Sequence, residues 1–354
     1  MSGHGERLAA GVTNLLLLLG SVAASVALAE LVSWGYVRWA RPELRTWPGD
    51  ATAKIETAPE YGYVLPANRT IRVVKHAADG AVCYDVTYRT DAFGRRTVQQ
   101  VYDPSHPHMI LFGCSVTMGE GLDDADTLAA RLAETLRGYN IYNYGVHGYG
   151  PQHMLARLQA RTLPREIVSD RGVALYFLLP AHISRAIGDT RAFWIYTSPY
   201  YYTVDGGDVL VRDGSFDAGR PYTTRLYRAF AGVKAHSWFL TLFDVNLPLR
   251  LSDRDAELTA RILEEARREY RAQFHGELYV VIHPTWARDD PESRHLLEVT
   301  RAHLAAAGVP VLDYSTDHGS GDDEQVNHAC DRHPNGRLNA ALAARMARDL
   351  GPPR

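Results

Sequence analysis

A serine lies in a glycine-flanked turn that directly follows a short apolar run. Residues 113–121 read Gly-Cys-Ser-Val-Thr-Met-Gly-Glu-Gly. At the end of a buried strand a hydroxyl becomes accessible, and the backbone N–H groups of the turn face nearby negative charge. Ser115 is therefore a candidate nucleophile, although the motif alone equally fits a serine that caps the turn. The spacing G-x-S-x-T differs from the G-x-S-x-G elbow of α/β-hydrolases.

A candidate base and its orienting carboxylate lie far along the chain, at His333 and Asp331. Alone, an Asp-x-His pair in a polar loop is usually solvated surface. A second glycine-rich segment, Asn-Tyr-Gly-Val-His-Gly at 143–148, lies between the serine and this pair. If all three segments follow strands of one parallel sheet, Ser115, His333 and Asp331 can meet as nucleophile, base and carboxylate.

The pattern from residue 108 onward predicts such a sheet. Short apolar runs alternate with segments of helical spacing, and Asp126 is the expected N-cap of the first helix. The expected strands are 109–113, 140–145, 173–180, 277–284 and 309–314, and the expected helices are 126–136, 152–163, 258–274, 295–308 and 338–350. This order predicts a flavodoxin-like three-layer α/β/α fold with a five-stranded parallel sheet.

Two further segments surround this pattern. Residues 38–106 contain short β-like runs and form a β-rich lead-in to the domain at 107–354. Residues 183–254 form an insertion, in which Asp-Gly-Gly at 205–207 predicts a hairpin turn. The aromatic residues of this insertion either stack on a sugar ring or, more often in hairpins, pack against each other; they are Trp194, Tyr196, Tyr200, Tyr201 and Tyr202.

The blocks at 113–121, 143–150 and 331–335 resemble those of the SGNH (GDSL-like) hydrolase superfamily, membrane-anchored bacterial members included. The resemblance covers about residues 107–350. It implies ester hydrolysis or acyl transfer through an acyl-enzyme, with Ser115 attacking, His333 taking the proton and Asp331 orienting the imidazole. It further implies an oxyanion hole built from the N–H groups of Ser115 and Gly148 and a side chain from a third block. No cofactor and no metal is expected.

The chain departs from the family pattern in three places. Cys114 stands where the family name has aspartate, which leaves the triad intact and makes a Cys114 nucleophile the weaker alternative. The Gly-x-Asn-Asp block is missing; His182 either supplies the lost oxyanion donor or only shapes the pocket. One residue separates Asp331 from the histidine where many members have two, so Asp322 or Asp323 could take its role.

The N-terminus contains an apolar segment at 15–37, after a tail at 1–14. As a helix it would span about 34 Å, enough to cross a bilayer core of about 30 Å. An aromatic and basic cluster suited to the membrane interface ends it: Trp34, Tyr36, Arg38 and Trp39. A signal peptide cleaved after Ala-Leu-Ala at 27–29 is the main alternative, and a buried core helix a weaker one. We expect a bacterial inner-membrane anchor with the domain on the periplasmic or extracellular side.

Composition argues against two other classes of protein, disordered chains and nucleic-acid-binding proteins. The 354 residues are 46% hydrophobic and 22% charged, which excludes a mainly disordered chain. A net charge of −3 argues against nucleic acid as a partner. The three cysteines allow one disulfide and one free thiol. Because Cys114 and Cys330 each adjoin a triad residue, we expect them to approach each other or to form a disulfide. The acidic, histidine-containing stretch 317–328 is expected to be a solvated loop rather than a metal site.

Two functions compete on this evidence. The first is a membrane-anchored esterase or acyltransferase whose substrate is a small-molecule or glycan ester. The second is a non-catalytic protein that binds glycan or lipid at the same sheet edge, which the missing Gly-x-Asn-Asp block favours.

Overall fold

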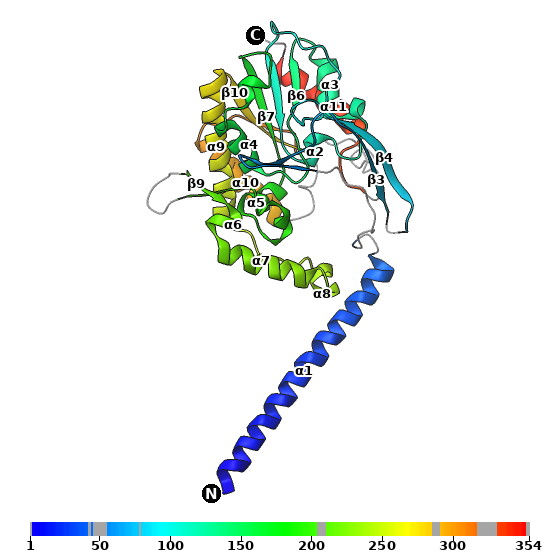
Figure 1. Ribbon diagram of the computed structural model, residues 1–354, viewed down its shortest axis with the longest axis vertical. Coiled ribbons are helices and arrows are strands. Elements are labelled where there is room, and N and C mark those ends of the chain that lie inside the picture. The colour runs from blue at the N-terminus through cyan, green and yellow to red at the C-terminus, as the bar shows by residue number, and fades with distance from the viewer. Residues whose placement is uncertain are drawn as a thin grey trace.

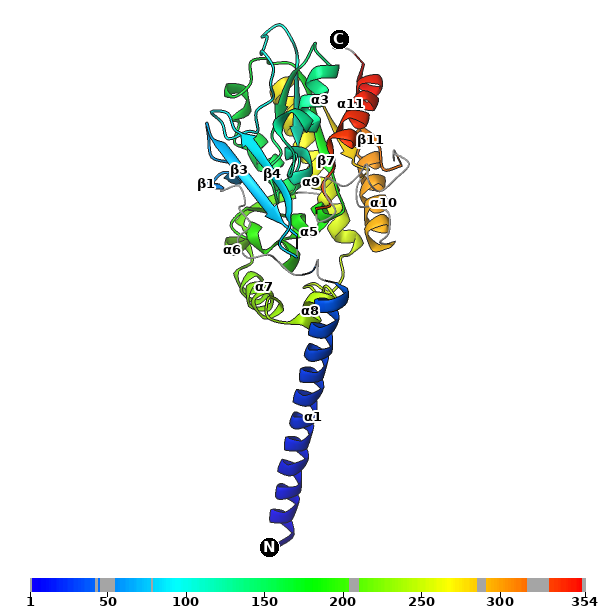
Figure 2. The same ribbon diagram turned by 90° about the vertical axis from the view of Figure 1, so that its right-hand side faces the viewer.

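The computed structural model describes residues 2–41, 44, 55–77, 79–203, 210–284, 291–316 and 331–351. A long helix, α1 (Ser2–Ala40), extends away from an α/β domain, and the chain's C-terminus lies at the opposite end of the molecule (Figures 1 and 2). The stretch 317–328, expected to be a solvated loop, lies outside the described residues, and so do Asp322 and Asp323, the alternatives to Asp331.

The domain contains the predicted five-stranded parallel sheet. Its strands are β5 (His108–Phe112), β6 (Asn140–Asn143), β7 (Gly172–Leu178), β10 (Glu277–Ile282) and β11 (Val311–Asp313). They lie in the order β11-β10-β7-β5-β6, and every neighbouring pair is parallel. Numbered along the chain this is the order 2-1-3-4-5, which is the flavodoxin-like arrangement.

Alternating side chains of the strands explain the two helical layers. Met109 and Leu111 of β5 pack with α3 (Leu128–Thr135) and α11 (Gly336–Leu350) on one face. Ile110 and Phe112 pack on the other face with α4 (Pro151–Gln159), α9 (Asp253–Phe274) and α10 (Pro291–Ala306). Residues of one strand point alternately to the two faces, so a strand covered on both sides is apolar throughout. The predicted three-layer fold is confirmed.

The predicted cap of the first domain helix is wrong. Asp126 ends a short 3-10 turn, η2 (Asp124–Asp126), and Thr127 is the N-cap of α3, because its hydroxyl accepts a hydrogen bond from the N–H of Ala130 at 3.2 Å. Either residue type can cap a helix. The choice depends on the path of the chain before the helix, which local sequence does not determine.

The lead-in contains two antiparallel pairs that pack on the domain. They are β1 (Glu56–Ala58) with β2 (Gly62–Val64), and β3 (Thr70–His76) with β4 (Val82–Arg89). Tyr63 and Tyr88 from this module are buried together with Met118 and Val146, which follow β5 and β6. The lead-in therefore covers the edge of the sheet at which the strands end.

The segment predicted as an insertion, 183–254, starts within α5 (Ala181–Ile187) and contains a 3-10 segment, η4 (Thr190–Ile195). The predicted hairpin is present as the antiparallel pair β8 (Pro199–Thr203) and β9 (Leu210–Ser215), while its turn at 205–207 lies outside the described residues. Three helices come next, namely α6 (Phe216–Gly219), α7 (Pro221–Lys234) and α8 (Trp238–Leu242). Both views place α7 and α8 at the end of the domain that faces α1 (Figures 1 and 2).

Candidate active site

Ser115 is the first residue of a four-residue helix, α2 (Ser115–Met118), which starts directly after β5. Two glycines allow the tight packing of this turn. A Cβ at Gly113 would lie 2.1 Å from the hydroxyl of Thr117, and one at Gly145 would lie 2.4 Å from the backbone nitrogen of Met118. Both positions are thus restricted to glycine by the close approach of α2 to the strand ends.

Asn143 connects the second glycine-rich loop to the same turn. Its side-chain oxygen accepts from the N–H of Gly145 at 3.0 Å, and its amide nitrogen donates to the carbonyl oxygen of Thr117 at 3.0 Å. Asn143 and its two partners are buried, so these hydrogen bonds are sheltered from water. They hold the loop after β6 against the helix that carries Ser115.

The structure brings Ser115, His333 and Asp331 together. His333 Nε2 lies 2.8 Å from Ser115 Oγ, and His333 Nδ1 lies 2.6 Å from Asp331 Oδ1. The backbone N–H of His333 donates to the same carboxylate oxygen at 2.8 Å. With Nδ1–H donated to the carboxylate, the lone pair of Nε2 faces the serine hydroxyl. This is the geometry in which an imidazole can accept the proton of a serine nucleophile.

The loop that carries the pair is held in front of α11. Asn335 caps this helix, because its side-chain oxygen accepts from the N–H groups of Arg337 at 3.1 Å and Leu338 at 3.0 Å. Asn339, one turn further, donates to the carbonyl oxygen of Asp126 at 2.9 Å. The cap at Asn335 fixes the Asp-x-His segment to the start of α11, and Asn339 fixes the same helix to the chain that follows α2.

Two charged residues that the sequence analysis did not single out adjoin this chain of hydrogen bonds. Lys75 of β3 places its Nζ 2.9 Å from Asp331 Oδ2. Glu120 places a carboxylate oxygen 3.9 Å from His333 Nε2. A lysine in the middle of a lead-in strand carries no local signal for such a role. Glu120 lies within the glycine-rich block, yet nothing in its spacing indicates a contact with the distant histidine.

Burial and these neighbours act in opposite directions on the ionisable groups. Burial disfavours the charged form of Asp331, but hydrogen bonds from His333 and Lys75 outweigh it and hold the pKa of Asp331 well below its usual range. Burial also lowers the pKa of His333. The hydrogen bond to Asp331 and the charge of Glu120 outweigh that effect, while Lys75 opposes them, and the net pKa of His333 is raised. The carboxylate is therefore charged wherever the imidazole titrates.

Two of the three predicted oxyanion donors, the backbone N–H groups of Ser115 and Gly148, have no protein acceptor within the described part of the chain, whereas the third, His182, is fully buried. Gly148 adopts a positive φ of 77°, and a Cβ there would lie 2.4 Å from Trp194 Nε1 and 2.8 Å from the Tyr63 hydroxyl. This glycine is thus required by its backbone conformation and by its neighbours, and its N–H stays available to a ligand.

His182 has no exposed surface. Its Nδ1 lies 2.8 Å from the hydroxyl of Tyr176 and accepts from the N–H of Leu179 at 3.4 Å. Burial lowers its pKa well below the ordinary value, so the ring is neutral. These contacts favour the alternative in which His182 shapes the turn after β7, and its role as an oxyanion donor stays a prediction.

The disulfide involves a different cysteine from the one expected. Cys114 is a free, buried thiol that packs with Val116 and Leu179, so its predicted disulfide with Cys330 is wrong. Its side chain points into the core because neighbouring residues of the extended strand end point in opposite directions. Cys83 of β4 is disulfide-bonded. Cys330 itself lies outside the described residues, so the expected approach of Cys114 and Cys330 stays a prediction.

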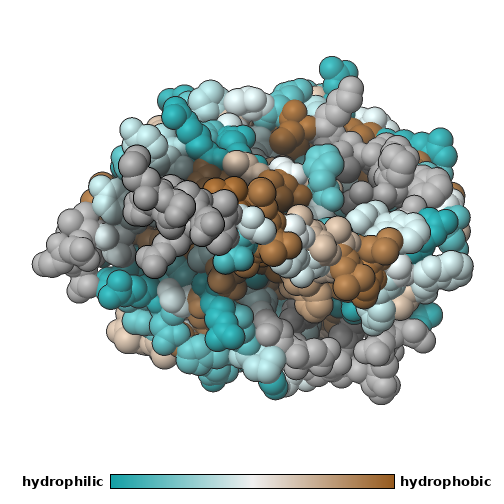
Figure 3. Space-filling view, turned by 90° about the horizontal axis from the view of Figure 1, so that it is seen from below, coloured by the Kyte–Doolittle hydropathy of each residue, from teal (hydrophilic) through white to brown (hydrophobic). Residues whose placement is uncertain are grey.

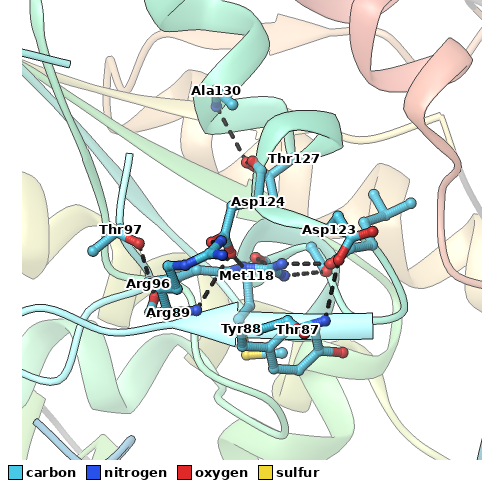
Figure 4. A network of polar contacts seen from close by, with 12 residues as sticks. Thr87, Tyr88, Arg89, Arg96, Thr97, Met118, Asp123, Asp124, Thr127 and Ala130 are labelled. Carbon is cyan, nitrogen blue, oxygen red and sulfur yellow. Dashed lines mark hydrogen bonds and ion pairs between the residues drawn. The ribbon is translucent and has the colours of Figure 1, made fainter. Parts of the chain in front are cut away.

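A buried arginine connects the lead-in to the turn of the candidate nucleophile (Figure 4). Arg96 is 1% exposed, stacks on the ring of Tyr88 and donates to Asp124 Oδ1 at 3.0 Å. It also donates to the backbone carbonyl oxygens of Met118, Gly119 and Leu122. These carbonyls end α2 and begin the following loop, so one guanidinium holds the segment that comes after Ser115.

Comparisons with solved structures find neighbours of low sequence identity. No family model and no curated protein matches the chain. A G-D-S-L family lipolytic protein from Veillonella parvula is 15% identical, with a TM-score of 0.40 over 69% of this chain and 97% of that one. TesA is 13% identical, with a TM-score of 0.41 over 69% and 98% of the two chains. A catalytic mutant of an acetylxylan esterase from Geobacillus stearothermophilus is 11% identical, with a TM-score of 0.40 over 72% and 98%.

These matched structures carry the family names that the sequence blocks resemble. The chemistry open to this chain follows from the geometry of its own Ser115, His333 and Asp331.

The aromatic residues of the insertion split into two groups. Tyr196 and Tyr201 are fully buried, and Tyr200 packs on Phe216 with ring centroids 5.2 Å apart, as expected for a packing face. Trp194 differs, because it is 44% exposed and its indole N–H donates to the carbonyl oxygen of Gly148 at 3.3 Å. An exposed aromatic ring therefore lies directly beside the predicted oxyanion loop.

Proposed function

We propose that the chain is a membrane-tethered serine esterase or acyltransferase of the SGNH type. The observation that carries this proposal is the chain of hydrogen bonds from Ser115 Oγ through His333 to Asp331, with distances of 2.8 and 2.6 Å. A serine, a histidine and a carboxylate in this order activate the hydroxyl for attack on a carbonyl carbon.

In the first half of the reaction, Ser115 Oγ forms a bond to the carbonyl carbon of the ester while its proton moves to His333 Nε2. The N–H groups of Ser115 and Gly148 are the proposed donors to the resulting oxyanion. As the carbon–oxygen bond of the ester breaks, His333 returns the proton to the leaving alcohol, and an acyl-enzyme remains. In the second half, water or a sugar hydroxyl forms a bond to the acyl carbon while its proton moves to His333 Nε2. As the bond between that carbon and Ser115 Oγ breaks, His333 returns the proton to Oγ.

The charges around the histidine fit this cycle. Asp331 stays ionised and stabilises the imidazolium that forms in each half-reaction. Lys75 donates to the other oxygen of the same carboxylate, so Asp331 is fixed from two sides. We infer that Lys75 is a positioning residue, because it contacts Asp331 and acts on the histidine only through it.

A fluorophosphonate probe and a short acyl ester test the assignment. The full-length protein should be labelled by the probe and should hydrolyse p-nitrophenyl acetate. Ser115→Ala should abolish labelling, and His333→Ala should strongly reduce turnover while leaving the fold intact by circular dichroism. Labelling that persists in Ser115→Ala would exclude this serine as the nucleophile.

We further propose an acylated glycan as the substrate. Support comes from Trp194, whose exposed ring lies beside Gly148, because aromatic rings stack on the apolar faces of sugars. Trp194→Ala should raise KM for an acetylated oligosaccharide and leave KM for p-nitrophenyl acetate nearly unchanged. Equal effects on both substrates would argue against a sugar site at this position.

The second candidate function is non-catalytic binding of glycan or lipid at the same edge. The loop after β7 favours it, because the side chain predicted to complete the oxyanion hole, His182, has no exposed surface. Tight glycan binding without turnover of any ester in the wild-type protein would support this alternative.

We propose that the domain lies on the exported side of a bacterial inner membrane. Support comes from Cys83, because stable disulfides form in oxidising compartments and are rare in the cytosol. The apolar part of α1, Gly11–Ala40, is long enough to cross a bilayer.

A further inference from the structure

Helices α7 and α8 turn an apolar face away from the domain. On α7, Tyr222, Leu226 and Val233 are 83%, 59% and 61% exposed, and their spacing places them on one side of the helix. On α8 and just after it, Phe239 and Phe243 pack on each other with ring centroids 4.8 Å apart, and Phe243 is 62% exposed. Large apolar residues gathered on one face indicate an interaction surface.

A carboxylate from α1 holds this face in place. Glu30 accepts hydrogen bonds from the N–H groups of Trp238 at 2.7 Å and Phe239 at 3.3 Å, and from the hydroxyl of Ser237. These groups form the N-terminal end of α8, where backbone N–H groups have no partner within the helix. Helix α8 is therefore held at the level of Glu30 along α1.

The exposure of α1 also changes at Glu30. Side chains 11–28 are exposed in the protein, as Leu17 and Leu28 are at 66% and 62%. Beyond Glu30, Ser33 and Val37 follow on one face of α1 and are 3% and 0% exposed. The exposed apolar part of α1 thus ends where the contact with α8 begins.

The position of Glu30 along α1 matches the boundary of a membrane. Residues 11–29 rise about 28 Å as a helix, close to a hydrocarbon core of about 30 Å. A carboxylate is costly within hydrocarbon, so Glu30 marks the outer limit of the span. Trp34 and Tyr36, which are 42% and 52% exposed, then lie in the interface, where aromatic side chains concentrate. The proposed span lies nearer the N-terminus than the predicted 15–37.

We propose that α7 and α8 lie flat on the bilayer surface, with Tyr222, Leu226, Val233 and Phe243 inserted at the boundary between headgroups and acyl chains. This rests on the membrane tether of the proposed function. Figure 3 views the molecule from the end at which α1 leaves, and the band of apolar residues in front follows α1, the proposed span. Exposed Arg225 stands next to Leu226 and suits a lipid phosphate. The domain would then contact the membrane both through α1 and through α7 and α8, and these two contacts would fix its orientation relative to the bilayer.

Depth-dependent quenching tests this surface in the full-length protein. Single Leu226→Cys and Val233→Cys variants are labelled with an environment-sensitive fluorophore and reconstituted into phosphatidylcholine–phosphatidylglycerol vesicles containing nitroxide-labelled acyl chains. Leu17→Cys reports the span. Arg348→Cys is the control, because it is exposed near the end of α11, close to the C-terminus at the far end of the molecule (Figure 1).

Positions 226 and 233 should be quenched to an extent closer to position 17 than to position 348. Quenching at 226 and 233 no stronger than at 348, with position 17 quenched, overturns the surface and leaves the tether standing. Cross-linking of two Val233→Cys chains without lipid quenching assigns the face to a second copy and overturns the proposal as well. Absence of quenching at position 17 overturns both the tether and the surface.

Glu30 provides a second test in the Val233→Cys background. Glu30→Ala removes the acceptor of the α8 N–H groups and should lower quenching at position 233 towards that of position 348. Glu30→Gln keeps an acceptor and should retain most of the quenching. Equal quenching in the two variants would contradict the role of Glu30 in holding α8 at the membrane.

Discussion

Replacing Arg96 by methionine should destabilise the domain through the turn after the candidate nucleophile. The guanidinium is buried and donates to Asp124 and to three carbonyl oxygens, those of Met118, Gly119 and Leu122. Methionine keeps an apolar stem but donates nothing. Removal of one partner of a buried ion pair costs about 3–5 kcal/mol, and a buried acceptor left unpaired costs about 1–3 kcal/mol. Because these costs overlap, we expect a net loss of about 3–5 kcal/mol.

The assay is thermal unfolding of the full-length protein in detergent, followed by tryptophan fluorescence. A loss of this size should lower Tm by roughly 10 °C in a domain of this length. Arg89→Met is the matched control. Arg89 reaches the other oxygen of Asp124 at 2.9 Å, but its side chain is 54% exposed, so its loss should cost at most about 1 kcal/mol. Equal melting temperatures for the two variants would refute the reasoning.

Three further predictions concern the site and the compartment. Activity should fall as pH drops through the pKa of His333, because the base must be neutral. Glu120 raises this pKa and Lys75 lowers it, so Glu120→Gln should move the acid limb of kcat/KM to lower pH and Lys75→Met should move it to higher pH. Shifts of both variants in the same direction would contradict these roles. Asp331→Asn should lower kcat about 10³–10⁴-fold, and a loss below tenfold would point to another carboxylate. Peptide mapping without reduction should find Cys83 in a disulfide, and a free thiol there would argue against an exported domain.

The sequence marked Ser115 as a candidate through a local signal, and the distant block at 331–335 then favoured the nucleophile over a capping serine. A buried strand must end before a nucleophile can be exposed, and the apolar run, the glycines and the serine stand in direct succession. Lys75 could not be predicted in this way. Its contact with Asp331 joins the lead-in hairpin to the last loop of the domain, and no spacing in either segment indicates the other. The predicted N-cap at Asp126 failed for a related reason, since threonine also caps helices and the preceding chain path decides between Asp126 and Thr127.

Local pattern determined the class of the fold and the presence of a long apolar helix near the N-terminus. Apolar runs alternating with helical periodicity allow few arrangements other than a parallel sheet covered on both faces, because each run must bury both of its sides. Tertiary structure decided which distant side chains meet: the serine hydroxyl with the imidazole, the lysine of the lead-in with the carboxylate, and Glu30 with the start of α8. Such contacts depend on strand order and on the packing of whole segments. Residues far apart in the chain carry no periodic signal of one another.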